Sequence, residues 1–317
     1  MSKFDGVDTE LFVVGKPTDL DLKLSIGLDL HFGRPMDEHR EEVLAVWEAL
    51  LDWRGRERFT WARLGGGNKS RKMAPAAYRT VQMWLDGSRP YGDHCFINVQ
   101  DGPFECIGQE AFLVDGNNRP IEDEDDTDIN HVQMRFGLEV AEDADELATR
   151  LQALAAPLRY ASGAAGLMLH ATPFGRNRLW KEMRALVTRY EGVEPDMADK
   201  ANWMAGEGVP DVNWLTFVGQ PHLDALAGKD ALIAAASAAP GVTAADTGHG
   251  VMLRAGERPR MGDRNHPSNA LDPYREVYRL LKPALYQLGD FGFSDSDFDA
   301  DQTLEWQQRF ERTAAGP

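Results

Sequence analysis

The stretch DLDLKLSIGLDLHF, residues 19–32, alternates apolar and polar side chains without a break. Every second residue from Leu20 to Phe32 is Leu, Ile or Phe, and the positions between them are Asp, Lys, Ser, Gly and His. A period of two places the apolar side chains on one face of a β-strand. The stretch therefore predicts a half-buried strand of the kind found in antiparallel sheets.

Amphipathic helices follow this strand in a recurring order. Residues 34–53 place Val43, Val46, Trp47, Leu50 and Leu51 at helical spacing, with Asp37 as the expected N-cap. A similar order returns about 110 residues later, as a strand over 132–140, a helix over 143–158 and a strand over 166–171. A third unit has a strand over 212–219, short helices over 221–237, a strand pair around 241–256 and a last clear helix over 272–288.

These patterns together predict an α+β fold with antiparallel sheets and amphipathic helices packed on one face. The recurrence also suggests an internal pseudo-repeat, although the copies share no evident identity. Because no long low-complexity linker interrupts residues 1–317, we expect a single compact domain. Within it the pattern suggests halves at 1–160 and 161–288, followed by an acidic C-terminal extension at 289–317.

Acidic residues dominate the charge of the chain. The formal net charge is −17, and two segments, 117–147 and 290–305, supply most of it. Such a chain repels nucleic acid and anionic membrane surfaces, so we expect it to bind neither. The simpler interpretation of these acidic segments is a solvated surface that aids solubility. The more specific interpretation is a surface that attracts a basic protein. The acids expected at such a surface are Glu122, Asp123, Glu124, Asp125, Asp126, Asp128, Asp295, Asp297, Asp299 and Asp301.

Known catalytic and metal-binding motifs are missing from the sequence. The acids from Asp295 onward resemble the start of an EF-hand, but that loop needs Gly where Ala300 stands and Glu where Trp306 stands. The glycine-rich stretch at 64–72 has Asn68 directly before its lysine, unlike a phosphate-binding loop. Zinc patterns and a nucleophile elbow are also absent from the sequence. We therefore expect no metal and no cofactor.

One cluster of titratable residues keeps an enzymatic alternative open. Asp246, His249, Asp263 and His266 lie close together in sequence and have side chains suited to metal binding or acid–base chemistry. If they converge in a pocket, the protein is a metal-dependent hydrolase. A third alternative is an adaptor that joins larger assemblies through an exposed apolar patch.

Location follows from the cysteines and the N-terminus. Cys95 and Cys106 fit a reduced cytosolic protein, although a disulfide between them is not excluded. The first residues lack a basic start followed by an apolar run, so no secretory signal is predicted. No apolar run reaches the roughly 18–20 residues of a membrane span. We expect a cytoplasmic protein.

Three stretches carry a family resemblance. They are LHFGRPMDEHREEVLAVWEALL at 30–51, VNWLTFVG at 212–219 and GVMLRAGERPRMGDRN at 250–265. In this order and spacing the chain resembles the TsiV-like immunity proteins of type VI secretion systems, over roughly residues 20–288. The acidic tail after Gly289 lies outside this resemblance.

The resemblance implies a non-catalytic antitoxin. Members of this family bind a cognate toxic effector, often a nuclease, and a protein of this kind would occlude the active or substrate-binding site of that effector. The expected partner is then an effector with a basic surface. The motif residues are expected to have structural roles, and they are Asn213, Trp214, Arg254, Gly256, Pro259, Gly262 and Asp263.

Overall fold

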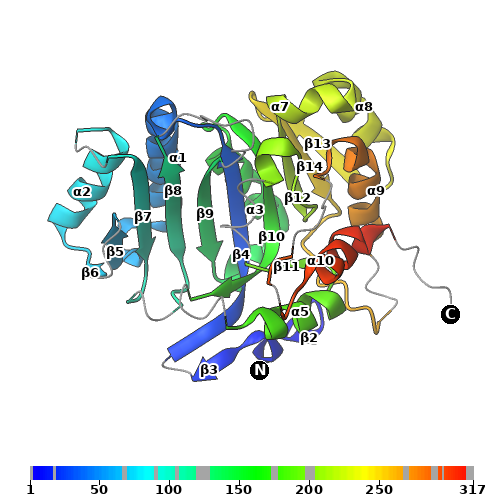
Figure 1. Ribbon diagram of the computed structural model, residues 1–317, viewed down its shortest axis with the longest axis horizontal. Coiled ribbons are helices and arrows are strands. Elements are labelled where there is room, and N and C mark those ends of the chain that lie inside the picture. Colours follow the sequence, from blue (N-terminus) through cyan, green and yellow to red (C-terminus); the bar gives the residue numbers. More distant parts are fainter. Residues whose placement is uncertain are drawn as a thin grey trace.

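Strand β4 (Asp19–Phe32) lies near the middle of the molecule, as the alternation predicts (Figure 1). The computed structural model describes residues 3–16, 19–65, 70–88, 92–103, 107–118, 129–172, 178–196, 204–266, 271–286, 292–294 and 296–311. β4 pairs antiparallel with β10 (Tyr160–Ala171) on one side and with β9 (Asn130–Phe136) on the other. These pairings join the N-terminal strand to segments more than 100 residues away.

Twelve of the described strands form one sheet. Its order is β13 (Val242–Asp246), β14 (Gly250–Ala255), β12 (Leu215–Gly219), β10, β4, β9, β8 (Ala111–Asn117), β7 (His94–Gln100), β5 (Trp61–Leu64) and β6 (Arg71–Lys72). β3 (Val14–Lys16) also pairs with β4, and β11 (Val193–Glu194) pairs with β10 as the one parallel neighbour among the described strands. A small hairpin, β1 (Lys3–Phe4) and β2 (Val7–Asp8), stands apart.

Helices cover this sheet. The α-helices are α1 (Arg40–Arg54), α2 (Pro75–Leu85), α3 (Ala144–Ala155), α5 (Trp180–Arg189), α7 (Gln220–Leu223), α8 (Lys229–Ala238), α9 (Asp272–Leu281) and α10 (Ala300–Gln307). The short 3-10 helices are η1 (Thr9–Phe12), η2 (Met36–His39), η3 (Arg56–Arg58), η4 (Leu138–Ala141), η5 (Asp224–Leu226), η7 (Lys282–Ala284) and η8 (Gln308–Phe310). No helix among these described residues is long and apolar enough to cross a bilayer.

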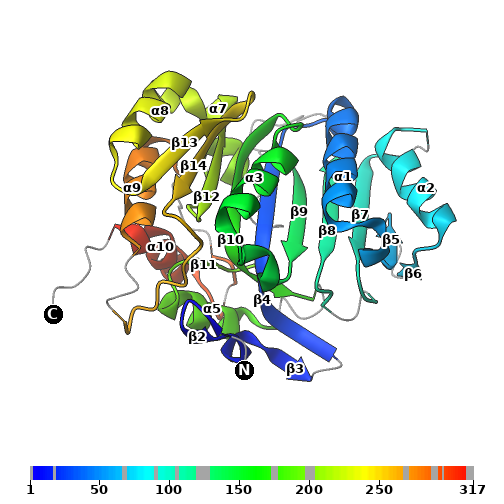
Figure 2. The same ribbon diagram turned by 180° about the vertical axis from the view of Figure 1, so that it is seen from behind.

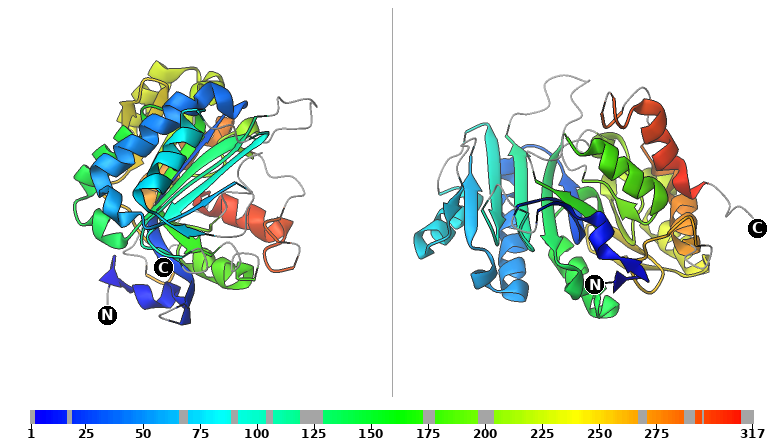
Figure 3. Two further views of the ribbon diagram at one scale, coloured as in Figure 1. Left: turned by 90° about the vertical axis from the view of Figure 1, so that its left-hand side faces the viewer. Right: turned by 90° about the horizontal axis from the view of Figure 1, so that it is seen from below.

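The predicted α+β class, with antiparallel strands and helices, is confirmed. α1 and α3 lie side by side on one face of the sheet (Figure 2). α5 and α10 lie on the opposite face (Figure 3). An internal pseudo-repeat is not confirmed, because the strand order differs on the two sides of the sheet. Outward from β4 the neighbours are β9, β8 and β7, in reverse chain order. Outward from β10 they are β12, β14 and β13, which do not follow that pattern.

The core on the first face consists of the side chains that the sequence pattern selects. Val43, Val46 and Leu50 of α1 are fully buried, and Trp47 packs against Phe112 with ring centroids 4.9 Å apart. Each such side chain contributes roughly 1.5–3 kcal/mol when it leaves water. The expected N-cap was wrong. Asp37 lies inside η2 and pairs with Arg40, so residues 36–39 form a separate 3-10 turn before α1 begins.

The expectation of a half-buried β4 is also wrong, because its polar face is covered as well. Ser25 and His31 are buried. At Gly27 an added Cβ would lie 2.2 Å from Met168 Sδ and 2.8 Å from Arg135 Nη1. Asp196 lies over this face, accepting hydrogen bonds from Gln133 Nε2 at 3.2 Å and from the Ala171 amide at 3.1 Å. The chain after α5 thus folds back over the polar side of the sheet.

Candidate functional site

The acids expected at a partner surface fall into two groups. Glu122, Asp123, Glu124, Asp125, Asp126, Asp128 and Asp295 lie outside the described residues. Asp297, Asp299 and Asp301 are described, and they stand at the start of α10. The acidic segment 290–305 was considered a metal loop, a solvated tail or a surface, and no helix was predicted there. In the structure it leads into a short helix.

Asp299 is the N-cap of α10. Its carboxylate accepts a hydrogen bond from the Gln302 amide at 2.9 Å, and Gln302 Oε1 accepts one from the Asp299 amide at 3.3 Å. This reciprocal capping box satisfies amides that the first helical turn leaves without partners. Asp301 is exposed in the first turn, where a negative charge is favourable near the helix N-terminus. Two of the regularly spaced acids, Asp299 and Asp301, are therefore explained by their positions at the start of α10.

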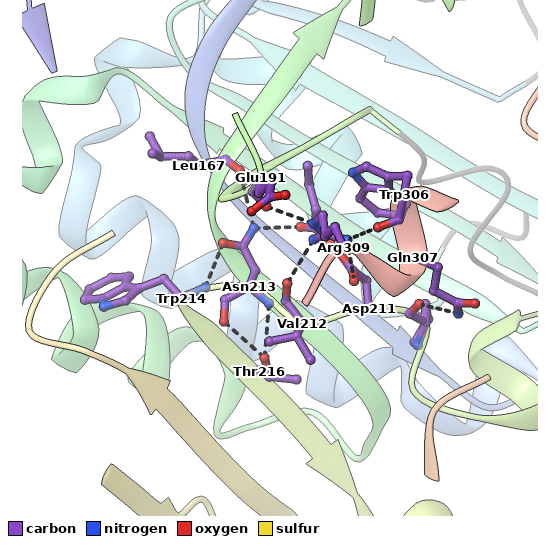
Figure 4. Close-up of polar contacts among 12 residues, drawn as sticks. Leu167, Glu191, Asp211, Val212, Asn213, Trp214, Thr216, Trp306, Gln307 and Arg309 are labelled. Atoms are coloured by element: carbon purple, nitrogen blue, oxygen red, sulfur yellow. Dashed lines mark hydrogen bonds and ion pairs between the residues drawn. The ribbon is translucent and has the colours of Figure 1, made fainter. Parts of the chain in front are cut away.

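The end of this helical segment is anchored by Arg309, which is only 4% exposed. Its guanidinium donates to both carboxylate oxygens of Asp211, at 3.0 and 2.5 Å, and its Nε donates to the Glu191 carbonyl at 2.8 Å (Figure 4). The same side chain stacks near the ring of Trp306, 4.0 Å from the centroid. A bidentate pair of this kind is geometrically specific and holds the C-terminal segment against the strand β12 region.

A second buried carboxyl group stands beside this pair. Glu194 accepts a hydrogen bond from Asn213 Nδ2 at 2.8 Å. Burial, and then the nearby charge of Asp211, raise the pKa of Glu194 well above its usual value. Burial also raises the pKa of Asp211, against the opposing effect of Arg309. Since two close carboxylates in a dry site repel each other, the pair retains a proton more readily than exposed acids do.

The motif residues Asn213 and Trp214 directly precede strand β12. Asn213 Nδ2 also contacts the Leu167 carbonyl at 3.3 Å, and its Oδ1 accepts from the Trp214 amide at 2.7 Å (Figure 4). The Trp214 ring is fully buried, and its indole N–H donates to the Gly256 carbonyl at 3.3 Å. Arg254 lies over this ring, 5.3 Å from the centroid, and forms an ion pair with Asp145 at 2.7 Å. These contacts join β12, the turn after β14 and α3.

The other motif residues shape the loop after β14. Pro259 is buried, and Gly262 has a φ of +67°, where only glycine is unstrained. Asp263, 4% exposed, accepts from Arg189 Nε at 3.2 Å and from its Nη2 at 3.0 Å. The Arg189 hydrogen bond, against the effect of burial, lowers the pKa of Asp263. That the seven motif residues have structural roles stays a prediction.

The enzymatic cluster does not assemble. Asp246 stands at the turn between β13 and β14, where it pairs with Lys229 at 2.8 Å and accepts from the Gly248 amide. His249 belongs to this turn. Asp263 lies instead beside α5, paired with Arg189, and the His266 amide donates to its carbonyl at 2.9 Å. Across the described part of the chain, no three His, Cys, Asp or Glu side chains are arranged to hold a metal. A metal site built from these four residues is therefore wrong.

Described acids also gather around the start of α3. Asp143 caps the helix by accepting from the amides of Asp145 and Glu146, and Glu146 faces Arg150 at 3.4 Å. Glu142, Asp143, Asp145 and Glu146 are all exposed. This acidic group is adjacent to α1, which adds the exposed acids Glu41, Glu48 and Asp52. The exposed surfaces of α1 and of the start of α3 therefore carry seven described acids.

A pocket of about 470 Å³ opens on the other side, between α5 and α10. Its lining includes Arg184 and Arg189 from α5, Arg264 from the loop, and Trp306 from α10. Sequence reasoning missed this pocket because it assigned residues 290–305 to a surface or a tail. The signal that was available is the spacing of Asp299 and Gln302, which is that of a capping box, followed by Trp306 and Phe310 one turn apart.

Comparison with known proteins identifies the family. The model of the family described as TsiV, type VI immunity for VRR-NUC, matches residues 55–310. The match begins later than the resemblance seen in the sequence and extends further, so it includes α10. Among solved structures, the Pseudomonas aeruginosa T6SS protein PA0821 superposes with a TM-score of 0.76 and 18% identity, over 95% of this chain and 88% of that one.

At this identity the structural likeness shows a shared fold. Among curated proteins, none matches the chain. The family match spans far more than half of the sequence, from η3 to the last described helix. The chain belongs to the TsiV family of type VI immunity proteins for VRR-NUC.

Proposed function

We propose that this protein is a non-catalytic antitoxin, which binds a VRR-NUC nuclease effector and occludes its active or substrate-binding site. The observation that carries the proposal is the family match over residues 55–310, whose description names immunity against such a nuclease. The proposal is further supported because Asp246, His249, Asp263 and His266 form no group among the described residues that could hold a metal, as the alternative of a metal-dependent hydrolase requires.

Electrostatics gives this binding a physical basis. A nuclease needs a cationic groove to hold phosphates. A protein with a net charge of −17 is complementary to such a groove, and it can compete with DNA for it. Complementary fields also accelerate encounter, up to about 10⁸–10⁹ M⁻¹s⁻¹ at low salt. Speed matters for an antitoxin, because the effector arrives active.

The proposed location is the cytoplasm, where an incoming nuclease would meet the DNA of the cell. We further propose that the chain acts as one unit. The support is that β4 and β10, which belong to different predicted halves, pair along most of their length. α10, which belongs to the predicted extension, packs Trp306 and Phe310 into the core.

A titration of nuclease activity tests the proposal. A purified VRR-NUC nuclease domain of the partner effector is mixed with increasing amounts of this protein, and cleavage of plasmid DNA is followed. We expect activity to fall linearly to zero near a ratio of one to one. A nuclease that keeps full activity at a tenfold excess of this protein would overturn the proposal. Complete loss of nuclease activity at a ratio far below one to one would indicate that this protein acts as an enzyme.

A further inference from the structure

The pocket between α5 and α10 has an unusual charge for this molecule. Four arginines line it, namely Arg184 and Arg189 on α5, Arg264 on the loop after β14 and Arg309 of η8. Gln302, Glu305 and Trp306 close it from α10. The rest of the described surface that we considered for a partner, around α1 and α3, is acidic. A ligand that fits the pocket should therefore be negatively charged, unlike a ligand that fits the acidic surface around α1 and α3.

Two of the carboxylates near the pocket lie behind arginines. The Asp263 side chain is 2% exposed and that of its partner Arg189 is 45% exposed. Glu191, at 10%, lies 3.5 Å from Arg264, which is 39% exposed. Glu305 on α10 differs, because it lines the pocket and is exposed. With four arginines against Glu191 and Glu305, the lining as a whole is cationic.

Hydrogen-bond donors remain for such a group. Asp263 engages Nε and Nη2 of Arg189, which leaves Nη1 without a partner among the described residues. Arg184 makes no ion pair or hydrogen bond with any residue that the structure describes. Trp306 also lines the pocket. The free N–H groups of a guanidinium suit a planar anion.

We propose that this pocket binds a carboxylate side chain of the nuclease, so that an acidic residue of the partner inserts between α5 and α10. This inference rests on the proposed function. A carboxylate is favoured over a DNA phosphate because the net charge of the chain repels nucleic acid. It also fits the partner chemically, since nucleases that use divalent cations hold them with carboxylates inside an otherwise cationic groove.

Charge reversal in the pocket tests the inference. The full chain carrying Arg184→Glu is compared with Arg279→Glu, a matched variant on α9 whose arginine is 65% exposed and pairs with Glu276 among the described residues. Both changes alter the net charge equally. We expect Arg184→Glu to weaken the dissociation constant for the nuclease by at least about tenfold, and Arg279→Glu by less than about threefold. Unchanged melting temperatures exclude misfolding as the cause.

The outcomes separate the two proposals. If the wild-type chain binds the nuclease and Arg184→Glu binds like Arg279→Glu, the pocket inference is overturned and the proposed function stands. If the wild-type chain does not bind the nuclease, the proposed function fails.

A second measurement tests the pocket without the nuclease. The Trp306 indole N–H resonance, assigned with Trp306→Phe, is followed while a hexaglutamate peptide or a short single-stranded DNA is added to the wild-type chain. We expect the peptide to shift this resonance and the DNA to leave it in place. A shift with DNA alone, or no shift with the peptide, would contradict a carboxylate pocket.

Discussion

Glu194 is a carboxyl group that folding places in an unfavourable environment. It is buried beside Asp211, and its pKa is raised by burial and by that neighbour. A raised pKa means that the folded state holds a proton which the unfolded chain releases. The stability from this group is therefore present below its unfolded pKa and is lost as the pH rises through its folded pKa.

Replacing this group with an amide should flatten the pH dependence. When the pH rises from about 5 to about 8, the unfolding free energy of Glu194→Gln should fall by less than that of the wild type, because the amide cannot ionise. Urea denaturation at the two pH values measures the difference. Glu42→Gln is the control, since hydrogen bonds from Arg159 and His39 lower the pKa of Glu42 in spite of burial. Equal pH slopes for the wild type and Glu194→Gln would contradict this account.

Gly262 shows how a single Cβ would disturb the loop after β14. An added Cβ would lie 2.3 Å from Leu271 Cδ1, at a φ of +67°. Leu271 is 1% exposed, so it has little room to move. We expect Gly262→Ala to cost about 2–5 kcal/mol of unfolding free energy, from backbone strain and overpacking together.

Gly248→Ala provides the matched comparison for this substitution. Gly248 also has a positive φ, of +85°, but nothing lies within 4 Å of an added Cβ. Its cost should be backbone strain alone, about 1 kcal/mol. Thermal denaturation of both variants gives the two values, and equal losses would show that the contact with Leu271 is unimportant.

At the scale of elements, α10 depends on its cap. We expect Asp299→Ala to reduce the unfolding free energy by about 0.5–2 kcal/mol, because it removes the carboxylate that accepts a hydrogen bond from the Gln302 amide. Asp301→Ala removes an exposed acid from the same turn and should cost less than about 1 kcal/mol. Urea denaturation distinguishes them. If both variants keep their stability but bind the nuclease more weakly, these acids face the partner instead.

Arg309 fastens the same element to the β12 region. Arg309→Met would leave the buried Asp211 without its counter-charge, and we expect a loss of about 3–5 kcal/mol. Adding Asp211→Asn removes that unpaired charge, so the double variant should be more stable than Arg309→Met alone. Denaturant unfolding of Arg309→Met, Asp211→Asn and the double variant measures this coupling. A double variant whose loss equals the sum of the two single losses would show that the residues do not interact.

The sequence predicted elements whose signal is local. β4 and α1 follow directly from periods of two and of about 3.6 residues, and both are confirmed. The burial of the polar face was not predicted, because it depends on distant segments: Ser25 donates to the Met168 carbonyl, and Asp196 accepts from Gln133. The α5–α10 pocket was missed for a similar reason. Its lining comes from residues 184–191, 264–265 and 302–309, and no local pattern brings these segments together.

At the scale of the whole molecule, charge should control the rate of association. We expect the association rate constant for the nuclease to fall by at least about tenfold between 0.05 and 0.5 M salt, with a smaller change in the dissociation rate. Reversing Asp123, Glu124, Asp125 and Asp126 to Lys should reduce that salt dependence. Stopped-flow binding measures both. An unchanged rate and an unchanged salt slope would exclude this segment from steering.

The pairing of β4 with β10 has a consequence for when protection begins. The two strands are joined over most of their lengths, yet residues 33–159 are synthesised between them. At about 5–20 residues per second, a ribosome needs on the order of ten to thirty seconds to reach the end of β10. Contacts this distant also slow folding itself. Chains that are still being synthesised when a nuclease arrives therefore cannot yet have the paired β4 and β10. On the proposed function, protection at that moment comes from molecules that have already folded.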